Sequence, residues 1–401
     1  MTVTAIRAAV AARAVRAIGL MSGTSHDGIS AALIEIDPVE IDPAANPPSR
    51  LIAFRSYPYA AGLRARLLRA AGGQGVGTGE ISALNFDLGR AFGRAALDIS
   101  RRARIPLGRL SFIGSHGHTV FHLPPRTAGR GQTPSTLQLG ESAVVAAMTG
   151  VAVVSDFRPM DIALGGEGAP LAPLAHVWMF RDRKLGRVIQ NIGGVANATY
   201  VPPGGSRVIA FDTGPGVMLI DALASKSSLG RLRMDRDGKM AACGTVSARL
   251  LADLMRDPYF RRRPPKSTGR EQFGADYLAQ IEARARRFAI RGDDLIATVT
   301  ALTARSIADA CRKFVLPLGR VDQLIATGGG ARNPVLLRML AKELQEIEVT
   351  TANQLGVDGD ALEAVAFAIL GYRMLRGEPG NIPSVTGARS PAILGKLTLP
   401  P

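Results

Sequence analysis

Small residues that can bind an anion recur in four short stretches of this 401-residue sequence. Each stretch combines glycines with Ser, Thr, Asn or Asp, and they span residues 22–28, 191–197, 212–216 and 327–332. Glycines allow positive φ angles and close approach, so successive backbone N–H groups can converge on one anion. One such loop would be weak support. Four of them predict a nucleotide held in a cleft between two lobes.

Other common binding motifs are missing or incomplete. The Walker A sequence and the protein-kinase signatures do not occur. No strand precedes the glycine cluster at 72–77, which we interpret as a flexible connector. His116, His118 and His122 have a spacing that would suit zinc, and His116 and His118 would share one face of a strand. No fourth zinc ligand is evident.

The elements that must position these loops alternate along the chain. Apolar runs that read as buried strands, each delivering a loop, span residues 110–119, 151–157, 187–197, 207–216 and 324–334. Helical spacing is found at 293–315, 333–344 and 360–375. Asn333 is the expected N-cap of the second helix, with Pro334 at its first position. This alternation predicts an α/β fold whose functional loops lie beyond the carboxyl ends of the strands.

Composition limits the class of protein. A length of 401 residues favours two domains, and 46% apolar with 20% charged residues is typical of a globular chain. Two cysteines suit a reducing cytosol, so we expect a cytoplasmic protein. No apolar stretch approaches the roughly 20 residues that span a bilayer, and no recognition-helix pattern or aromatic stacking platform occurs, so we expect neither membrane nor nucleic-acid partners. The net charge of +16 is spread along the chain, and only seven of the 49 basic residues are lysine. We interpret this charge as arginine side chains on solvated faces of the protein. The second interpretation is that it attracts anionic small-molecule substrates.

Nine ordered blocks, between Gly19 and Lys396, carry a resemblance to a known family. They are GLMSGTSHDG, GSHGHT, DFRPMDIALGGEGAPLAP, NIGGVAN, FDTGPG, PKSTGREQF, TGGGARNP, GDALEAVAFA and NIPSVTGA. The chain resembles the anhydro-N-acetylmuramic acid kinases, sugar kinases of the actin/hexokinase/Hsp70 ATPase superfamily. The resemblance implies a two-lobed, actin-like (ribonuclease H-like) α/β fold with ATP in the interlobe cleft. We expect a flexible basic extension at 1–16, an N-terminal lobe at 17–156, a C-terminal lobe at 157–380, and a segment at 381–401 that packs back on the N-terminal lobe.

The activity that the resemblance implies uses ATP and Mg²⁺. These kinases open the 1,6-anhydro ring of anhydro-N-acetylmuramic acid with water and phosphorylate O6. The products are N-acetylmuramic acid 6-phosphate and ADP, in cell-wall recycling. A kinase for another 1,6-anhydro sugar, such as levoglucosan, and a catalytically silent sugar sensor of the same fold stay open as alternatives. A homodimer is one option for the oligomeric state.

The resemblance also implies roles for single residues. Asp212 matches the general base, and Asp27 in the first phosphate loop would face Mg²⁺ through water. The residues expected to bind ATP or phosphate are Gly23, Thr24, Ser25, His26, Asp27, Gly28, Ile29, Ser30, Asn191, Gly193, Gly194, Gly214, Gly216, Gly328, Gly329, Gly330 and Arg332. The residues expected to bind the sugar are Ser22, His116, His118, Arg158 and Glu167, with Arg158 on the lactyl carboxylate.

Ordinary structural roles compete with some of these assignments. Asp27 could cap a turn, and Asp212 could cap a helix over 215–225. Lys266 and Arg270 could be surface charges or part of a lobe contact.

Four positions depart from the usual pattern of the family. His26 replaces an apolar residue, and Ser30 stands where an acid is common. His118 replaces a glutamine and Val217 an asparagine, which puts the identity of the sugar in more question than the type of reaction.

Overall fold

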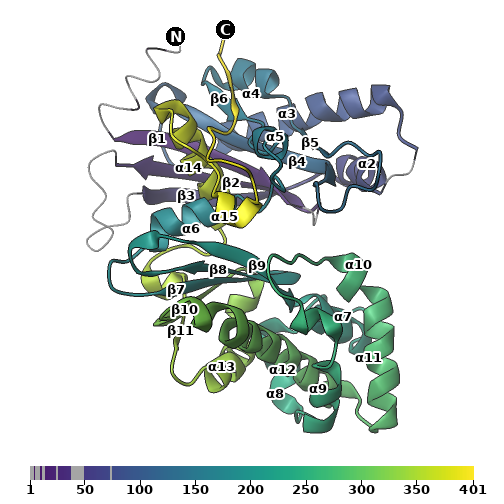
Figure 1. Ribbon diagram of the computed structural model, residues 1–401. Helices are drawn as coiled ribbons and strands as arrows, with labels where there is room; N and C mark the ends of the chain where they lie inside the picture. Colours follow the sequence, from purple (N-terminus) through teal and green to yellow (C-terminus); the bar gives the residue numbers. More distant parts are fainter. Residues whose placement is uncertain (1–3, 5–9, 11–13, 24–25, 38–48, 73–74) are drawn as a thin grey trace. The chain divides into compact units, whose positions relative to one another are not determined.

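The computed structural model describes residues 4, 10, 14–23, 26–37, 49–72 and 75–401. The chain divides into two compact units, one formed by Met1–Phe180 with Ala361–Pro401 and the other by Arg181–Asp360 (Figure 1). These divisions differ from the lobe boundaries expected after residues 156 and 380. The reason is that α6 (Ala172–Phe180) and α14 (Leu362–Arg376) pack on each other within unit 1. Most of the expected extension at 1–16 lies outside the described residues.

Unit 1 is built on a mixed sheet with the strand order β12–β6–β4–β1–β2–β3, and β5 pairs with β4. The strands are β1 (Val15–Ser22), β2 (Gly28–Ile36), β3 (Ser49–Pro58), β4 (Phe112–Leu123), β5 (Ser135–Leu139), β6 (Val153–Ser155) and β12 (Lys396–Thr398). Strand β1 is antiparallel to β2 and parallel to β4. Its apolar residues enter separate cores on the two faces of the sheet, as Val15 and Ile18 illustrate.

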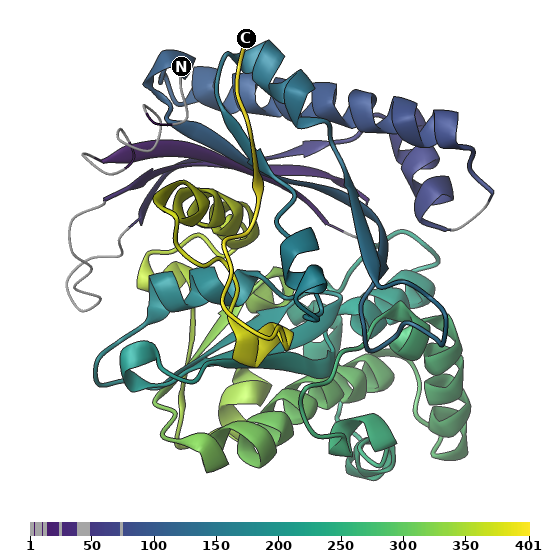
Figure 2. The ribbon, with the colours of Figure 1, turned by 45° about the horizontal axis from the view of Figure 1, so that its top comes forward.

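Helices cover both faces of this sheet. The long α3 (Thr78–Arg102) lies on one face and α14 on the other (Figure 2). The remaining helices of unit 1 are α2 (Ala61–Ala71), α4 (Ser142–Thr149), α5 (Pro159–Ala163) and α15 (Pro383–Thr386). Strand β12 pairs with β6, which ties the C-terminal segment to this unit.

Unit 2 has a smaller sheet with the order β11–β10–β7–β8–β9. Its strands are β7 (Arg187–Ile192), β8 (Val195–Val201), β9 (Ile209–Pro215), β10 (Gln323–Thr327) and β11 (Glu348–Thr351). Its helices are α7 (Met218–Ser227), α8 (Lys239–Cys243), α9 (Ala248–Leu254), α10 (Arg270–Phe273), α11 (Ala275–Arg287), α12 (Gly292–Ala310) and α13 (Pro334–Glu343). No helix among the residues described in either unit has the length and apolar character needed to cross a bilayer.

Most predicted elements are confirmed, but the loops expected at the ends of two runs differ. In the run at 187–197 the loop is only a turn at Gly193 and Gly194, because β7 ends at Ile192 and antiparallel β8 begins at Val195. In the run at 110–119 the expected loop is absent, because β4 continues through residues 112–123. The helix at 333–344 begins as predicted, because Oδ1 of Asn333 accepts the N–H groups of Val335 and Leu336 at 3.0 and 3.1 Å.

Candidate active site

Three of the four predicted glycine loops meet in unit 2. Strands β7 and β10 are parallel, with Asn191 opposite Thr327, so the loops that follow them are neighbours. The N–H of Gly216 donates to the carbonyl of Gly194 at 2.8 Å, which joins the loop after β9 to the β7–β8 turn. A Cβ at position 216 would lie 2.0 Å from the carbonyl oxygen of Gly193. Only glycine allows this approach.

The loop after β10 is packed as closely. Gly328 has a φ of 76°, and a Cβ there would lie 2.3 Å from Oδ1 of Asn191. A Cβ on Gly330 would lie 2.4 Å from the side chain of Ile192. Helices α7 and α13 begin directly after these loops, so each adds the positive end of its dipole. Of these two described helices, only α7 adds free backbone N–H groups, because it has no side-chain cap, whereas Asn333 caps the first N–H groups of α13. Arg332, in the same loop, pairs with Asp360 at 2.5 Å.

A β-bulge sets the position of Asp212. In the pairing of β8 with β9, Asn197 is opposite Asp212 but Ala196 is opposite Gly214, so Thr213 is an extra residue. Such bulges redirect side chains. The alternative role of Asp212 as a helix cap is excluded, because α7 begins at Met218 without any side-chain cap.

The carboxylate of Asp212 is held at one oxygen. Oδ2 accepts the backbone N–H of Thr268 at 2.8 Å, whereas Oδ1 has no hydrogen-bond partner among the described residues. Burial raises the pKa of Asp212 to about 6, although the Thr268 N–H and the charge of Lys266 act to lower it. A carboxylate with one free oxygen and this pKa is ionised at neutral pH and can accept a proton.

Lys266 is a buried residue, so the expectation of a surface charge is wrong. It is 6% exposed, and its ammonium lies 4.5 Å from the centre of the Tyr259 ring and 5.1 Å from that of Phe314. Nζ also donates to the carbonyl of Tyr259 at 3.3 Å. Burial lowers the pKa of Lys266 to about 8. Arg270 is exposed at the start of α10 and forms no ion pair among the described residues.

The first predicted phosphate loop joins β1 to β2 in unit 1. Thr24 and Ser25 lie outside the described residues, and His26 has a φ of 56°. The loop is shorter than expected, because Ile29 and Ser30 belong to β2. The side chain of Ile29 is 2% exposed in the core. That side chain is therefore part of the core of unit 1 and does not belong to the loop.

Asp27 lies at the end of this loop and is largely exposed. Its side chain is 69% exposed, and Oδ1 accepts from Arg64 of α2 at 2.9 Å. Oδ2 of Asp27 has no hydrogen-bond partner among the described residues. The described part of the chain contains no group of three or more His, Cys, Asp or Glu side chains placed to hold a metal ion.

His118 is the centre of a buried chain of hydrogen bonds. Its Nδ1 lies 2.9 Å from Oγ of Ser22, and its Nε2 lies 2.9 Å from Nδ1 of His26. Tyr59 donates its hydroxyl to Ser22 at 2.8 Å. Burial lowers the pKa of His118 to about 4, so the ring is neutral at pH 7. These bonds connect the phosphate loop to β4.

His116 has different neighbours, so the expectation that it shares a face with His118 is wrong. Gly117, with a φ of 76°, breaks the alternation of β4 between them. The ring of His116 packs 4.4 Å from that of Phe367, and its Nε2 accepts Nε–H of Arg158 at 2.9 Å. Arg158 also donates from Nη1 to the carbonyl of Gly168 at 2.7 Å. Its Nη2 forms no hydrogen bond with the described residues, although the carboxylates of Glu363 and Asp161 stabilise the charge of Arg158.

The remaining sugar-side residues belong to the loop after α5. Glu167 pairs with Arg126 at 3.5 Å, and burial raises the pKa of Glu167. The buried carboxylate of Asp161 holds this loop: it accepts from Gly168 N, Asn381 Nδ2 and Thr386 Oγ1 at 2.8, 2.8 and 2.7 Å.

Sequence reasoning missed several residues around the site. Tyr59, Tyr259 and Thr268 each contact a predicted site residue from a distant part of the chain. The block PKSTGREQF was a signal for Thr268. No comparable signal pointed to Tyr59, which follows an edge strand.

The two mixed sheets and the helices packed on them give this chain an α/β architecture of two compact units. The family model for anhydro-N-acetylmuramic acid kinase matches residues 15–400. The kinase of that name from Gloeobacter violaceus is 45% identical over 388 residues, covering 95% of this chain and 98% of that protein. Its counterpart from Caldanaerobacter subterraneus subsp. tengcongensis is 40% identical over 385 residues, covering 95% and 96%. The chain belongs to the anhydro-N-acetylmuramic acid kinase family.

Among solved structures, the comparison finds component A of the Acidaminococcus fermentans (R)-2-hydroxyglutaryl-CoA dehydratase. It is 12% identical with a TM-score of 0.46, covering 90% of this chain and 99% of that one.

Proposed function

We propose that this protein uses ATP to phosphorylate O6 of 1,6-anhydro-N-acetylmuramic acid while water opens the anhydro ring. Membership of the family supports this activity. The observation that carries the proposal is the carboxylate of Asp212, which has one oxygen held and one free beside three converging glycine loops.

In the proposed reaction Asp212 is the general base. Its Oδ1 accepts a proton from a water molecule, whose oxygen forms a bond to the anomeric carbon of the sugar. The bond from that carbon to O6 breaks, and O6 attacks the γ-phosphorus of ATP. The bond from the γ-phosphorus to the ADP oxygen then breaks. Water and ATP are consumed, and the products are N-acetylmuramic acid 6-phosphate, ADP and one proton, which Asp212 releases to solvent.

Backbone N–H groups supply most of the phosphate contacts in this proposal. They come from the glycine loop at 328–330, from Gly194 and from the first turn of α7, because the N–H groups of Gly193 and Gly216 and those at the start of α13 already have acceptors within the chain. The free oxygen and high exposure of Asp27 suit a magnesium ion that is bound mainly by phosphate and water. When bound, such an ion neutralises phosphate charge. We therefore assign Asp27 to the Mg²⁺ side.

Arg158 is the proposed partner of the lactyl carboxylate. It is fixed by His116 and by the carbonyl of Gly168, and it keeps Nη2 for a ligand. Arginine donates paired hydrogen bonds to a carboxylate, which levoglucosan lacks. This favours the muramic acid sugar over levoglucosan. The proposal also places the enzyme in the cytoplasm.

A comparison of two sugars and two proteins tests this assignment. We expect the wild type to release ADP with 1,6-anhydro-N-acetylmuramic acid about 10- to 100-fold more efficiently than with 1,6-anhydro-N-acetylglucosamine, which lacks the lactyl group. Arg158→Met should remove most of this preference through KM, and the second sugar serves as the internal control. A best rate with levoglucosan would favour the other sugar class. Sugar binding without ADP release would favour the silent sensor.

A further inference from the structure

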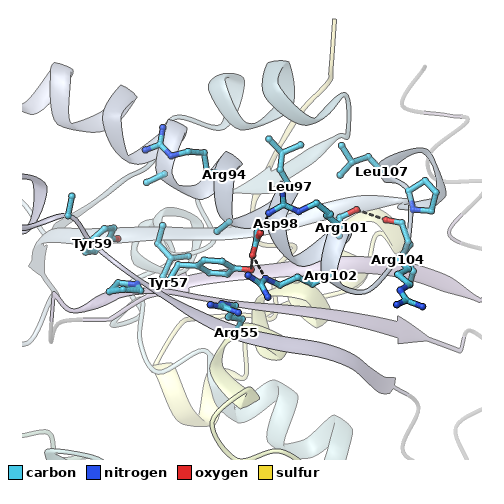
Figure 3. Close-up of a pocket in the computed structure, with 18 of the residues that line it drawn as sticks. Arg55, Tyr57, Tyr59, Arg94, Leu97, Asp98, Arg101, Arg102, Arg104 and Leu107 are labelled. Atoms are coloured by element: carbon cyan, nitrogen blue, oxygen red, sulfur yellow. Dashed lines mark hydrogen bonds and ion pairs between the residues drawn. The ribbon is translucent and has the colours of Figure 1, made fainter.

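Unit 1 contains a cavity that the proposed reaction does not use. Its volume is about 1180 Å³, and it lies between the end of β3, helix α3 and the segment that follows α3 (Figure 3). Pockets that bind small organic ligands usually have volumes of about 300–1000 Å³, so this cavity is large enough for such a ligand.

The lining of this cavity is strongly basic. It includes five arginines, Arg55, Arg94, Arg101, Arg102 and Arg104, and a single acid, Asp98. Asp98 is already engaged: Tyr57 donates to it at 3.0 Å, Arg102 at 2.6 Å, and Arg101 pairs with it as well. Figure 3 shows Asp98 between Tyr57 and Arg102. The one carboxylate therefore cannot neutralise the other arginines.

Three of the arginines are left without an acidic partner. Arg55, Arg94 and Arg104 are exposed and form no ion pair among the described residues. Arg94 and Arg104 lie on either side of the Asp98 cluster (Figure 3). Arg55 lies over the Tyr57 ring at 5.7 Å, which positions it at the cavity wall. Guanidinium groups in this state bind phosphate or carboxylate.

The cavity also has an apolar wall. Leu63 comes from α2, Leu97 from α3, and Ile105 and Leu107 from the segment after α3. These four side chains are partly buried, and all of them line the cavity. A ligand with an apolar body would bury them further, which inorganic phosphate cannot do.

We propose that this cavity binds a small organic anion, a phosphate or carboxylate group carried on an apolar body. The anionic group of the ligand lies against Arg94, Arg104 or Arg55, and its apolar body lies against the apolar wall. Such a ligand contacts Tyr59, which also lines the cavity. Tyr59 donates its hydroxyl to Ser22 and its N–H to the carbonyl of Asp27. The cavity is thus joined to the first phosphate loop by one residue.

Equilibrium dialysis of the full-length protein tests the proposal, with ADP at saturation to occupy the nucleotide site. The probes are 1-naphthyl phosphate, 1-naphthoate, inorganic phosphate and 1-naphthol. We expect one equivalent of 1-naphthyl phosphate or 1-naphthoate to bind, and inorganic phosphate and 1-naphthol to bind at least about tenfold more weakly. Comparison of the two naphthyl anions distinguishes phosphate from carboxylate as the preferred group.

A charge-matched pair of variants locates the site. The test variant carries Arg55→Gln, Arg94→Gln and Arg104→Asn, since Asn tolerates the positive φ at that position. The control carries Arg231→Gln, Arg233→Gln and Arg291→Gln, three exposed positions of unit 2. Affinity should fall at least about tenfold in the first variant and less than about twofold in the second. Equal affinity in both variants, or no binding of either naphthyl anion to the wild type, would overturn the proposal. Kinase activity is not the readout, so failure here leaves the proposed reaction untouched.

Discussion

The backbone N–H of Thr268 donates to Oδ2 of Asp212 at 2.8 Å. Two further hydrogen bonds join the backbone of Asp212 to the segment at 259–268. The N–H of Asp212 donates to the carbonyl of Lys266 at 3.1 Å, and the hydroxyl of Tyr259 donates to the carbonyl of Asp212 at 2.8 Å. The segment at 259–268 therefore fixes both the strand end and the carboxylate. A base held in this way needs little reorganisation before it accepts a proton.

Replacing Asp212 by Asn should abolish turnover without abolishing binding. Asn keeps the size of the side chain and its bond to Thr268, but it cannot accept a proton from water. We expect kcat to fall by about 10²- to 10⁴-fold with little change in KM, measured as sugar-dependent ADP release. Asp276→Asn, on the exposed side of α11, is the matched control and should keep its rate. An unchanged kcat in Asp212→Asn would exclude the assignment as base.

The same variant should gain stability at alkaline pH. Burial raises the pKa of Asp212 from 3.8 to about 6 in the folded state, so the folded protein holds this proton more tightly than the unfolded chain. The wild type therefore loses stability as the pH rises from about 4 to 6, by up to roughly 3 kcal/mol. Asn does not titrate. Thermal unfolding should show Asp212→Asn to be at least as stable as the wild type at pH 8, with a smaller difference at pH 5. A loss of stability at pH 8 would indicate a structural role.

Lys266→Met should shift the pH dependence of turnover. The Lys266 charge lowers the pKa of Asp212, and Met keeps an apolar stem against Tyr259 and Phe314. Without the charge, the acid limb of kcat should move to higher pH by roughly half a pH unit. The rate should then fall at pH 6 more than at pH 8. Lys239→Met, at an exposed position, is the control. A uniform loss at every pH would mean that Lys266 acts only through packing.

Local sequence signals predicted the glycine loops and the elements around them. The run VDQLIATGGGARNP combines an apolar strand, a glycine loop and an N-cap, and each of these depends on near neighbours in the chain. The structure accordingly has β10, the loop and α13 in that order. The assignment of Asp212 as the base stays a prediction; it rests on the FDTGPG block, in which the strand and its glycines are adjacent in sequence.

Contacts that depend on the folded chain could not be predicted. The bond from Thr268 to Asp212 joins residues 56 positions apart, and that from Tyr59 to Ser22 joins residues 37 apart. Lysine is usually found at the surface. The burial of Lys266 depends on the aromatic rings of Tyr259 and Phe314 and on the hydrogen bond from Nζ to the carbonyl of Tyr259, none of which the local sequence predicts. The separation of His116 from His118 depends on the backbone of one glycine. Patterns with a period of two do not contain that information.

Asp161→Ala should destabilise unit 1 through the C-terminal segment. The carboxylate accepts from Gly168, Asn381 and Thr386. The substitution removes this acceptor from the buried N–H of Gly168 and hydroxyl of Thr386, while Nδ2 of Asn381 keeps its bond to the carbonyl of Ser390 at 3.3 Å. The expected loss is at least about 3 kcal/mol, measured from the first transition of urea unfolding. Proteolysis within residues 381–401 should also become faster. Asp276→Ala is the exposed control, and equal effects of the two substitutions would contradict this role.

Asp27 and Arg64 should affect the magnesium requirement in opposite directions. Arg64 occupies Oδ1 of Asp27 at 2.9 Å and adds a positive charge beside it, so it competes with a cation for the same carboxylate. Asp27→Asn should raise the Mg²⁺ concentration for half-maximal ADP release by about tenfold, because the carboxylate charge is lost. Arg64→Gln should lower that concentration or leave it unchanged. The measurement is a Mg²⁺ titration of sugar-dependent ADP release at saturating ATP, with Arg69→Gln on the same helix as the control. If Asp27 only caps the turn, Asn replaces it without effect on the titration, and the assignment to the Mg²⁺ side is wrong.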